Sequence, residues 1–429
     1  MFDKRIINGR VYLDGNYKNT NLYIDNDFIK EINEKLLPAK ETIDVNNSLV
    51  IPGLTDPHVH FNLDLGQIKS RDNFYHGTLQ AAYGGITTII DFLDPVDNVE
   101  DLEKAYLKRL EEAKSSVVDY FFHATIKNPK CNLEDFVIKM KSLGINSLKL
   151  FTTYSESDRR TFDNEIIELL KLSEKYKFLL LAHIEHDAFI DLNPNLKYNC
   201  LLKSRPTQAE TIEALKLAGF VEKHGGFLYM VHLSSGNTLE KLKQEFPLIL
   251  NKKFFVESCP HYFVFTNDFL ERCDGYLYTL APPLRTRKER TLLKDNFDDI
   301  YSIGTDHCAF LKNDKNMKYL KDIPLGIGGI EFSFDTMYEL FKDKAIDKMS
   351  KNIASLYPNL NNQGEIKVGK LANLLIYELY DNFIDEFHGA TDYNLYENFK
   401  RSGRVLHTML RGEFIIKDQD FFKALGKKI

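Results

Sequence analysis

The chain has 429 residues, of which 43% are hydrophobic and 28% are charged, as is usual for globular proteins. The formal net charge is -6 and the basic residues are scattered among acidic ones, so no nucleic-acid partner is expected. No run approaches the roughly 18 apolar residues that a membrane span needs, and MFDKRIING at the amino terminus does not resemble a secretory signal. We therefore expect a cytoplasmic protein that is not bound to membranes.

Residues 1–52 contain short alternating apolar patterns separated by turn residues, as in RIINGRVYLDGNY, which are typical of β-strands. From residue 53 to 355, eight short apolar runs alternate with longer amphipathic stretches such as residues 99–114 and 208–219. The runs are the one before His58 and those at 87–92, 117–124, 147–151, 178–183, 227–233, 253–259 and 300–307. This alternation predicts an α/β fold, a (β/α)₈ TIM barrel.

The β pattern returns in residues 356–429, for example in GEIKVGKLANLLIYE and VLHTMLRGEFII. The simplest arrangement pairs this segment with residues 1–52. We therefore expect a small β-sandwich domain formed by both chain termini, beside a barrel over residues 53–355.

Six polar residues each lie near the end of an apolar run, where a barrel of this kind carries its chemistry. They are His58, His60, Lys149, His183, His232 and Asp306. His58 and His60 are one residue apart, so on a strand both side chains point to the same face, as metal ligands would. Two close dications need a bridging anion. Lys149 is the unusual member, because a lysine at the end of an apolar strand is paired, reaches the surface or is chemically altered.

Several stretches, in order along nearly the whole chain, resemble the dihydropyrimidinase or hydantoinase group of cyclic amidohydrolases, in the amidohydrolase superfamily. Among them are DPHVHF, SLKLFTTY, SRPTQAE, VHLSS, APPLR and GTDHCAF. The resemblance implies two divalent metal ions, which we expect to be zinc. It also implies that His58, His60 and Asp306 bind one ion, that His183 and His232 bind the other, and that a carboxylated Lys149 bridges both.

The same resemblance implies hydrolysis of a cyclic amide C–N bond in a dihydropyrimidine or a 5-substituted hydantoin. A hydroxide shared by the two ions would attack the ring carbonyl. Asp306 would take its proton and pass it to the leaving nitrogen, while the Tyr154 hydroxyl would help to stabilise the oxyanion. The alternative for Tyr154 is an aromatic residue at the rim of the site.

Substrate contacts are implied at backbone groups near Ala281 and Leu325, although serine and asparagine are common at these positions in the group. Asn62 occupies the position where dihydroorotases carry an arginine, so dihydroorotate is disfavoured and allantoin stays open. The loop SESDRRTFD after Tyr154 is charged where hydantoinases often have apolar residues. Either Arg159 or Arg160 faces an anionic substituent, or the loop is simply solvated.

Two alternatives of other kinds remain. One is a non-catalytic, dihydropyrimidinase-like scaffold protein, and the other is a mononuclear deaminase of the same superfamily. Because all six ligand positions are filled, the sequence favours the enzyme, with a small cyclic amide as its partner. The resemblance also implies a homo-oligomer, either a tetramer or a dimer. The remaining histidines are expected to be structural or surface residues, namely His76, His123, His186, His224, His261, His388 and His407.

Overall fold

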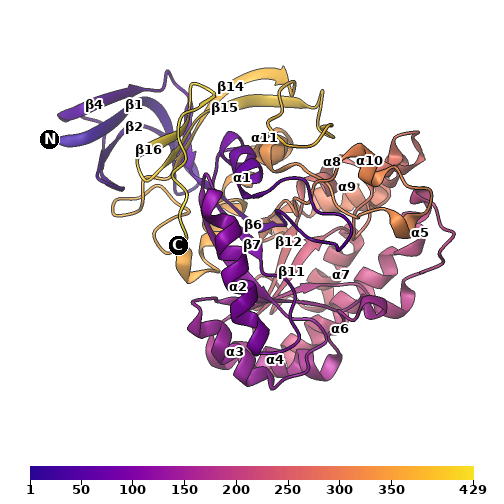
Figure 1. Cartoon of the computed structure of the whole chain (residues 1–429). Helices are drawn as coiled ribbons and strands as arrows, with labels where there is room; N and C mark the ends of the chain where they lie inside the picture. Colours follow the sequence, from indigo (N-terminus) through magenta and orange to yellow (C-terminus); the bar gives the residue numbers. More distant parts are fainter.

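A computed structural model describes residues 1–429 and contains a parallel barrel and a separate sheet built from both termini (Figure 1). Eight parallel strands follow one another around the barrel in sequence order. They are β6 (Leu54–Val59), β7 (Ile86–Phe92), β8 (Asp119–Thr125), β9 (Ser147–Phe151), β10 (Leu179–His183), β11 (Leu228–Leu233), β12 (Phe254–Ser258) and β13 (Ser302–Ile303). The predicted barrel is confirmed, and all eight apolar runs contribute strands.

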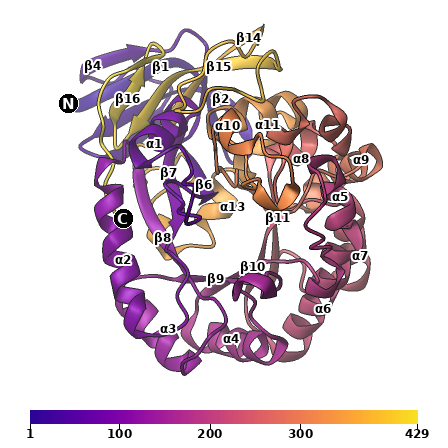
Figure 2. The same ribbon diagram turned by 45° about the vertical axis from the view of Figure 1, so that its right-hand side comes forward.

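Helices surround these strands, as Figure 2 shows for α2, α3, α4, α6 and α7. The main helices that follow the strands are α1 (Phe74–Tyr83), α2 (Glu100–Glu112), α3 (Leu133–Ser142), α4 (Asp163–Tyr176), α6 (Thr207–His224), α7 (Gly236–Glu245), α9 (Arg287–Asp295) and α11 (Ser333–Phe341). The shorter ones are α5 (Leu201–Ser204), α8 (Pro260–Val264), α10 (Lys312–Lys315), α12 (Lys344–Lys348) and α13 (Lys351–Ala354). Because helices cover the outside and side chains fill the inside, nearly every strand residue is buried.

The barrel closes between its first strand and the residues that follow its last one. The Asp306 N–H donates to the His58 carbonyl at 2.9 Å, and the His60 N–H donates to the His307 carbonyl at 2.9 Å. The seam of the barrel therefore brings His58 and His60, from its beginning, beside Asp306, from its end.

The terminal segments form one nine-stranded sheet. Its strands are β1 (Phe2–Leu13), β2 (Asn16–Asp25), β3 (Phe28–Asn33), β4 (Ala39–Asp44), β5 (Leu49–Pro52), β14 (Leu374–Phe383), β15 (Lys400–Leu410), β16 (Glu413–Lys417) and β17 (Asp420–Phe421). β5 joins the two ends of the chain by pairing with β1 and β14. The expected small β domain is confirmed. Its single sheet branches at β1: the first half of this strand pairs with β4, and the second half pairs with β5 along the same edge.

Contacts with buried carboxylates fix this sheet to the barrel. The Tyr377 hydroxyl of β14 donates to Asp335 of α11 at 2.8 Å, and Arg401 of β15 binds the same carboxylate at 3.0 Å. The last residues return to the barrel, where the Lys427 N–H donates to Asp119 of β8 at 3.0 Å. None of the helices is both long enough and apolar enough to cross a membrane.

Candidate metal centre and active-site cavity

His58, His60 and Asp306 meet at the carboxyl end of the barrel strands. The two Nε2 atoms are 3.2 Å apart, and each lies 3.2 Å from Asp306 Oδ1. Ligand atoms bound tetrahedrally to one zinc ion at about 2.0–2.1 Å lie about 3.3 Å from one another. These three side chains therefore have the spacing of ligands that share one metal ion.

His183 and His232 form a second pair beside the first. His183 Nδ1 lies 3.0 Å from His232 Nε2, and the ring centroids of His232 and His58 are 5.4 Å apart. This spacing again fits two ligands of one ion. The four imidazoles thus form two adjacent pairs, which fits the donor set of a centre with two metals.

Carboxylates hold the outer nitrogens of one histidine in each pair. Glu257 Oε1 lies 2.8 Å from His58 Nδ1, and Glu185 Oε2 lies 2.8 Å from His183 Nε2. Both carboxylates are fully buried. Such contacts orient metal-binding imidazoles and set which nitrogen carries the proton, so the inner nitrogens are left to face a metal.

Burial keeps three of the four imidazoles neutral, as metal ligation requires. It lowers the pKa of His60 to about 4, lowers the pKa of His183, and lowers that of His232 well below the usual range. Burial also opposes a charge on His58, but the Glu257 and Asp306 carboxylates raise its pKa to about 9. A metal ion at this site would therefore compete with a proton for His58.

Lys149 points into the same region from β9. It is 3% exposed, and its Nζ forms no hydrogen bond or ion pair with another residue. The nearest aromatic rings are Phe92 and Phe151, with centroids 5.3 and 5.7 Å from Nζ. Burial lowers the pKa of Lys149 to about 8, which leaves an appreciable fraction of neutral amine near neutral pH.

A cavity of about 590 Å³ opens above these side chains. Most of the predicted site residues line it, namely His60, Lys149, Tyr154, His183, His232, Ala281, Asp306 and Leu325. His58 is fully buried behind them. Their convergence on one cavity agrees with the expected site, and their individual roles stay predictions.

Asn62 is not part of the wall of this cavity, so the substrate contact expected there stays a prediction. Its backbone adopts a left-handed conformation with φ 50° and its N–H donates to the Asp72 carbonyl at 2.8 Å, so the chain turns immediately after His60. The two arginines of the charged loop after Tyr154 have different surroundings. Arg159 lines the cavity, whereas Arg160 binds Asp187 at 3.2 Å.

Three cavity residues have backbone conformations that are strained for side chains with a Cβ. Tyr154, His232 and Asp306 have φ values of 72°, 43° and 51°. Such conformations cost of the order of 1–3 kcal/mol each and concentrate at functional sites. His232 lies near the end of β11, and Tyr154 and Asp306 follow β9 and β13 by three residues, so all three lie where the strands open into the cavity.

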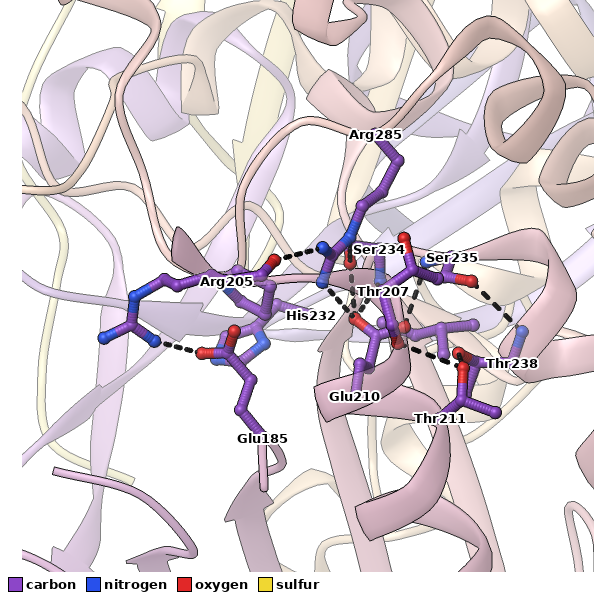
Figure 3. Close-up of polar contacts among 12 residues, drawn as sticks. Glu185, Arg205, Thr207, Glu210, Thr211, His232, Ser234, Ser235, Thr238 and Arg285 are labelled. Carbon is purple, nitrogen blue, oxygen red and sulfur yellow. Dashed lines mark hydrogen bonds and ion pairs between the residues drawn. The ribbon is translucent and has the colours of Figure 1, made fainter. Parts of the chain in front are cut away.

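A buried polar network supports the second histidine pair (Figure 3). Arg285 donates to the Ser234 hydroxyl at 2.8 Å and to the Arg205 carbonyl at 2.6 Å. Glu210 accepts the backbone N–H groups of Ser234 and Ser235 at 3.1 Å each. The motifs SRPTQAE, VHLSS and APPLR therefore meet in one network, which fixes the segment immediately after His232.

Sequence reasoning missed Glu257, Glu185 and Arg205. Arg205 binds Glu185, and its guanidinium carbon lies 4.8 Å from the Tyr154 ring centroid. Burial alone would raise the pKa of Glu185, but Arg205 and His183 lower it to about 2. The available signal was a charged residue inside or directly after an apolar run, as in KFFVESC and LLLAHIE.

Other histidines have protein partners, as the sequence predicts for structural residues. His123 contacts Ser147 Oγ at 2.6 Å and the Pro57 carbonyl at 2.9 Å. His186 contacts Glu213 at 2.8 Å. Neither histidine belongs to the cavity wall.

Comparisons with known proteins give consistent results. The amidohydrolase family matches residues 49–415. A D-hydantoinase from Geobacillus stearothermophilus is 29% identical over 99% of this chain and 95% of its own length. A D-phenylhydantoinase from Escherichia coli O9:H4 (strain HS) is 28% identical over 98% of this chain and 96% of its own. A D-hydantoinase (dihydropyrimidinase) structure from Thermus sp. superposes with a TM-score of 0.93 at 26% identity, covering 99% of this chain and 98% of that one.

The similarity extends over both the barrel and the terminal sheet. A second D-hydantoinase structure gives a TM-score of 0.92 at 27% identity and covers 99% of this chain and 98% of its own. The resemblance to the dihydropyrimidinase or hydantoinase group and the expectation of a hydrolase are thus confirmed. With a family match that spans most of its length, the chain belongs to the amidohydrolase family.

Proposed function

We propose that this hydrolase opens the ring of a dihydropyrimidine or a 5-substituted hydantoin with the help of two divalent metal ions, expected to be zinc. The observation that carries the proposal is the convergence of two histidine pairs, Asp306 and Lys149 at one cavity. The choice of substrate is supported by two similar proteins, a D-hydantoinase and a D-phenylhydantoinase, which match this chain over almost its whole length.

His58, His60 and Asp306 would hold one ion, and His183 and His232 the other. When bound, such ions activate water and polarise the ring carbonyl. Imidazole and carboxylate donors suit zinc, and the buried Glu257 and Glu185 are the outer partners that zinc-binding histidines usually have.

We further propose that Lys149 is carboxylated. Its neutral amine would add to CO₂, forming an N–C bond and releasing one proton, and the resulting carbamate would carry a negative charge. Support comes from the isolation of Nζ, which has no ionic partner in a buried position, and from the burial that favours the neutral amine. A carbamate would supply the bridging anion that offsets repulsion between two dications.

The other cavity residues have roles in moving protons and stabilising charge. Asp306 would take a proton from the attacking water and give it to the ring nitrogen that leaves. The Tyr154 hydroxyl would donate a hydrogen bond to the carbonyl oxygen as that oxygen gains negative charge. Burial raises the pKa of Tyr154 to about 12, so this hydroxyl keeps its proton at neutral pH.

The alternative functions can be distinguished by their substrate ring and by the number of bound metal ions. Allantoinase or dihydroorotase activity would use the same centre on a different ring, and Asn62 offers no cation for a ring carboxylate. A mononuclear deaminase would bind one metal per chain and would not need Lys149. A scaffold protein would bind none, and the complete set of ligand residues argues against it.

The test uses protein prepared with zinc and bicarbonate. Ring opening is followed by loss of amide absorbance on dihydrouracil, several 5-substituted hydantoins, allantoin and dihydroorotate, and metal per chain is measured in parallel. We expect about two zinc ions per chain and turnover of dihydrouracil or a hydantoin. Lys149→Ala should lose the second metal and the activity, whereas Lys171→Ala, at an exposed lysine of α4, should keep both.

If allantoin or dihydroorotate is hydrolysed and the other rings are not, the protein is an allantoinase or a dihydroorotase instead. Two metals without turnover of any ring would contradict the proposed substrates, and absence of metal would favour the scaffold. The expected homo-oligomer, a tetramer or a dimer, stays a prediction that light scattering of the same preparation tests.

A further inference from the structure

Two cations in the cavity wall lack a counter-charge. Lys127 and Arg159 line the cavity, and neither side chain forms an ion pair or a hydrogen bond. The other charged groups of the wall outside the metal centre are paired within the protein: Asp64 with Lys69 at 3.1 Å, Asp94 with Lys108 at 2.5 Å, and Arg109 with Glu112 at 3.0 Å. The wall therefore carries two positive charges that no carboxylate neutralises.

The fold places these two cations on adjoining loops. Lys127 lies two residues beyond β8, and Arg159 lies in the loop that follows β9, the neighbour of β8 in the barrel. The loops are joined at the adjacent positions, because the Asn128 amide donates to Asp158 and Lys130 binds the same carboxylate at 3.3 Å. Asp158 is thus occupied by partners other than Lys127 and Arg159.

Both side chains are half-buried rather than fully solvated. Cations that are partly withdrawn from water and unpaired inside a cavity attract an anion more strongly than surface charges do. An arginine fork can bind both oxygens of a carboxylate, and a lysine can add a further charge-assisted hydrogen bond. This part of the wall therefore has the chemistry of a carboxylate site.

We propose that Lys127 and Arg159 bind a carboxylate at the end of the substituent on the substrate ring. The inference rests on the proposed function, because the metal centre would hold the amide edge of the ring while the two cations hold its side chain. A cavity of about 590 Å³ is large enough for a ring with a short substituent. The preferred substrates are thus rings with a carboxyalkyl side chain, not those with an aromatic or aliphatic one.

The experiment compares two rings of the same size that differ in charge, 5-(2-carboxyethyl)hydantoin and 5-(2-carbamoylethyl)hydantoin. Binding to the zinc-loaded protein is measured by calorimetry, and hydrolysis is measured separately. Charge-assisted hydrogen bonds are worth enough to favour the carboxylate by about 10- to 100-fold in kcat/KM and in affinity. Added salt should reduce this preference, because it screens the two partly exposed cations.

Arg159→Gln, Lys127→Gln and the double variant test the assignment to these residues. The ratio of kcat/KM between the carboxylate and the amide should fall in each single variant and approach one in the double variant. Arg160→Gln is the matched control, since it removes a neighbouring charge that already has a protein partner, Asp187. It should keep the wild-type ratio.

Equal binding of the two rings by the wild-type protein would overturn the inference, as would equal losses in the variants and the control. If both rings are hydrolysed without preference, the proposed function stands and the inference alone fails. If neither ring is hydrolysed but the carboxylate binds more tightly through Lys127 and Arg159, the carboxylate site stands and hydrolysis of these hydantoins fails. Failure of both rings to bind overturns the inference, while the assay with dihydrouracil still decides the proposed function.

Discussion

The Arg205 guanidinium lies over the ring of Tyr154, with 4.8 Å between its central carbon and the ring centroid. The same guanidinium binds Glu185, whose Oε2 lies 2.8 Å from His183 Nε2. One cation thus connects the hydroxyl proposed to stabilise the oxyanion with a proposed metal ligand. Its removal would free the Tyr154 ring and leave the buried Glu185 carboxylate without its main partner.

We predict that Arg205→Gln lowers kcat by about 10- to 100-fold, the usual size of effects from residues that support metal ligands. KM should change less, because Arg205 is not itself part of the cavity wall. Steady-state kinetics with zinc-saturated protein and a count of bound metal give the two readouts. Arg287→Gln, at an exposed arginine that pairs with Asp268, is the control. Wild-type kcat in Arg205→Gln would show that Tyr154 is held by other contacts.

Glu257 connects both histidine pairs. It contacts His58 Nδ1 at 2.8 Å, accepts the His232 N–H at 3.0 Å and accepts the Tyr229 hydroxyl at 2.7 Å. Glu257→Gln keeps the shape but removes the charge that orients His58. We expect metal affinity to fall by about 10- to 100-fold, measured by competition with a chelator. Glu245→Gln, at an exposed position, should bind metal as the wild type does; an unchanged affinity in Glu257→Gln would contradict the role.

Removal of metal should destabilise the protein, because ions that bind only the folded chain add to its stability. We expect dialysis against a chelator to lower the melting temperature by several degrees and zinc to restore it. Calcium prefers sets of six to eight oxygen ligands, so it should not replace zinc at this histidine-rich centre. Identical melting curves with and without chelator would mean that the centre is not loaded in the folded protein.

The sequence predicts the barrel and the positions of the proposed ligands because both follow from local patterns. His58, Lys149 and His183 each lie at or near the carboxyl end of an apolar run, and the barrel geometry then places these ends together. The motif SRPTQAE is equally visible in the sequence, but its physical role is not. Only the folded chain shows that Glu210 and Arg285 meet beside Ser234, since the partners are far apart along the chain.

Loop residues are harder to predict, because their direction depends on backbone angles that the sequence does not specify. Arg159 and Arg160 are adjacent and chemically identical, yet only Arg159 lines the cavity. Asn62 follows His60 closely but turns away through a left-handed backbone conformation. Lys127 was missed for a related reason, since its place on the loop beside that of Arg159 depends on β8 and β9 being neighbours in the barrel.

Lys315 of α10 ties together two segments of the cavity wall. It is fully buried, and its Nζ donates to the Thr279 carbonyl at 2.8 Å and to the Gly326 carbonyl at 2.5 Å. These carbonyls lie close in sequence to Ala281 and Leu325, the proposed substrate contacts. Lys315→Met would leave two buried carbonyls without a donor, at about 1–3 kcal/mol each. We expect a lower free energy of unfolding and a higher KM. An unchanged KM would mean that Lys315 does not help to shape the substrate site.

The effect of Lys315→Met on stability should also depend on pH. Burial lowers the pKa of Lys315 to about 7, while the unfolded chain keeps the ordinary value of 10.5. Between these values the unfolded chain binds one more proton than the folded chain, so the free energy of unfolding of the wild type rises with pH, by up to about 1.4 kcal/mol per unit. The neighbouring Cys308 stays a neutral thiol in this range, because burial raises its pKa.

Lys315→Met lacks this titration, so its deficit in stability relative to the wild type should widen from pH 7 to pH 9. Urea unfolding of both proteins at pH 7, 8 and 9 measures the difference. Lys312→Met, at an exposed lysine of the same helix, should differ from the wild type by the same amount at each pH. A deficit for Lys315→Met that stays constant or narrows would mean that the folded protein holds Lys315 as an ammonium ion, with the two carbonyls compensating for its burial.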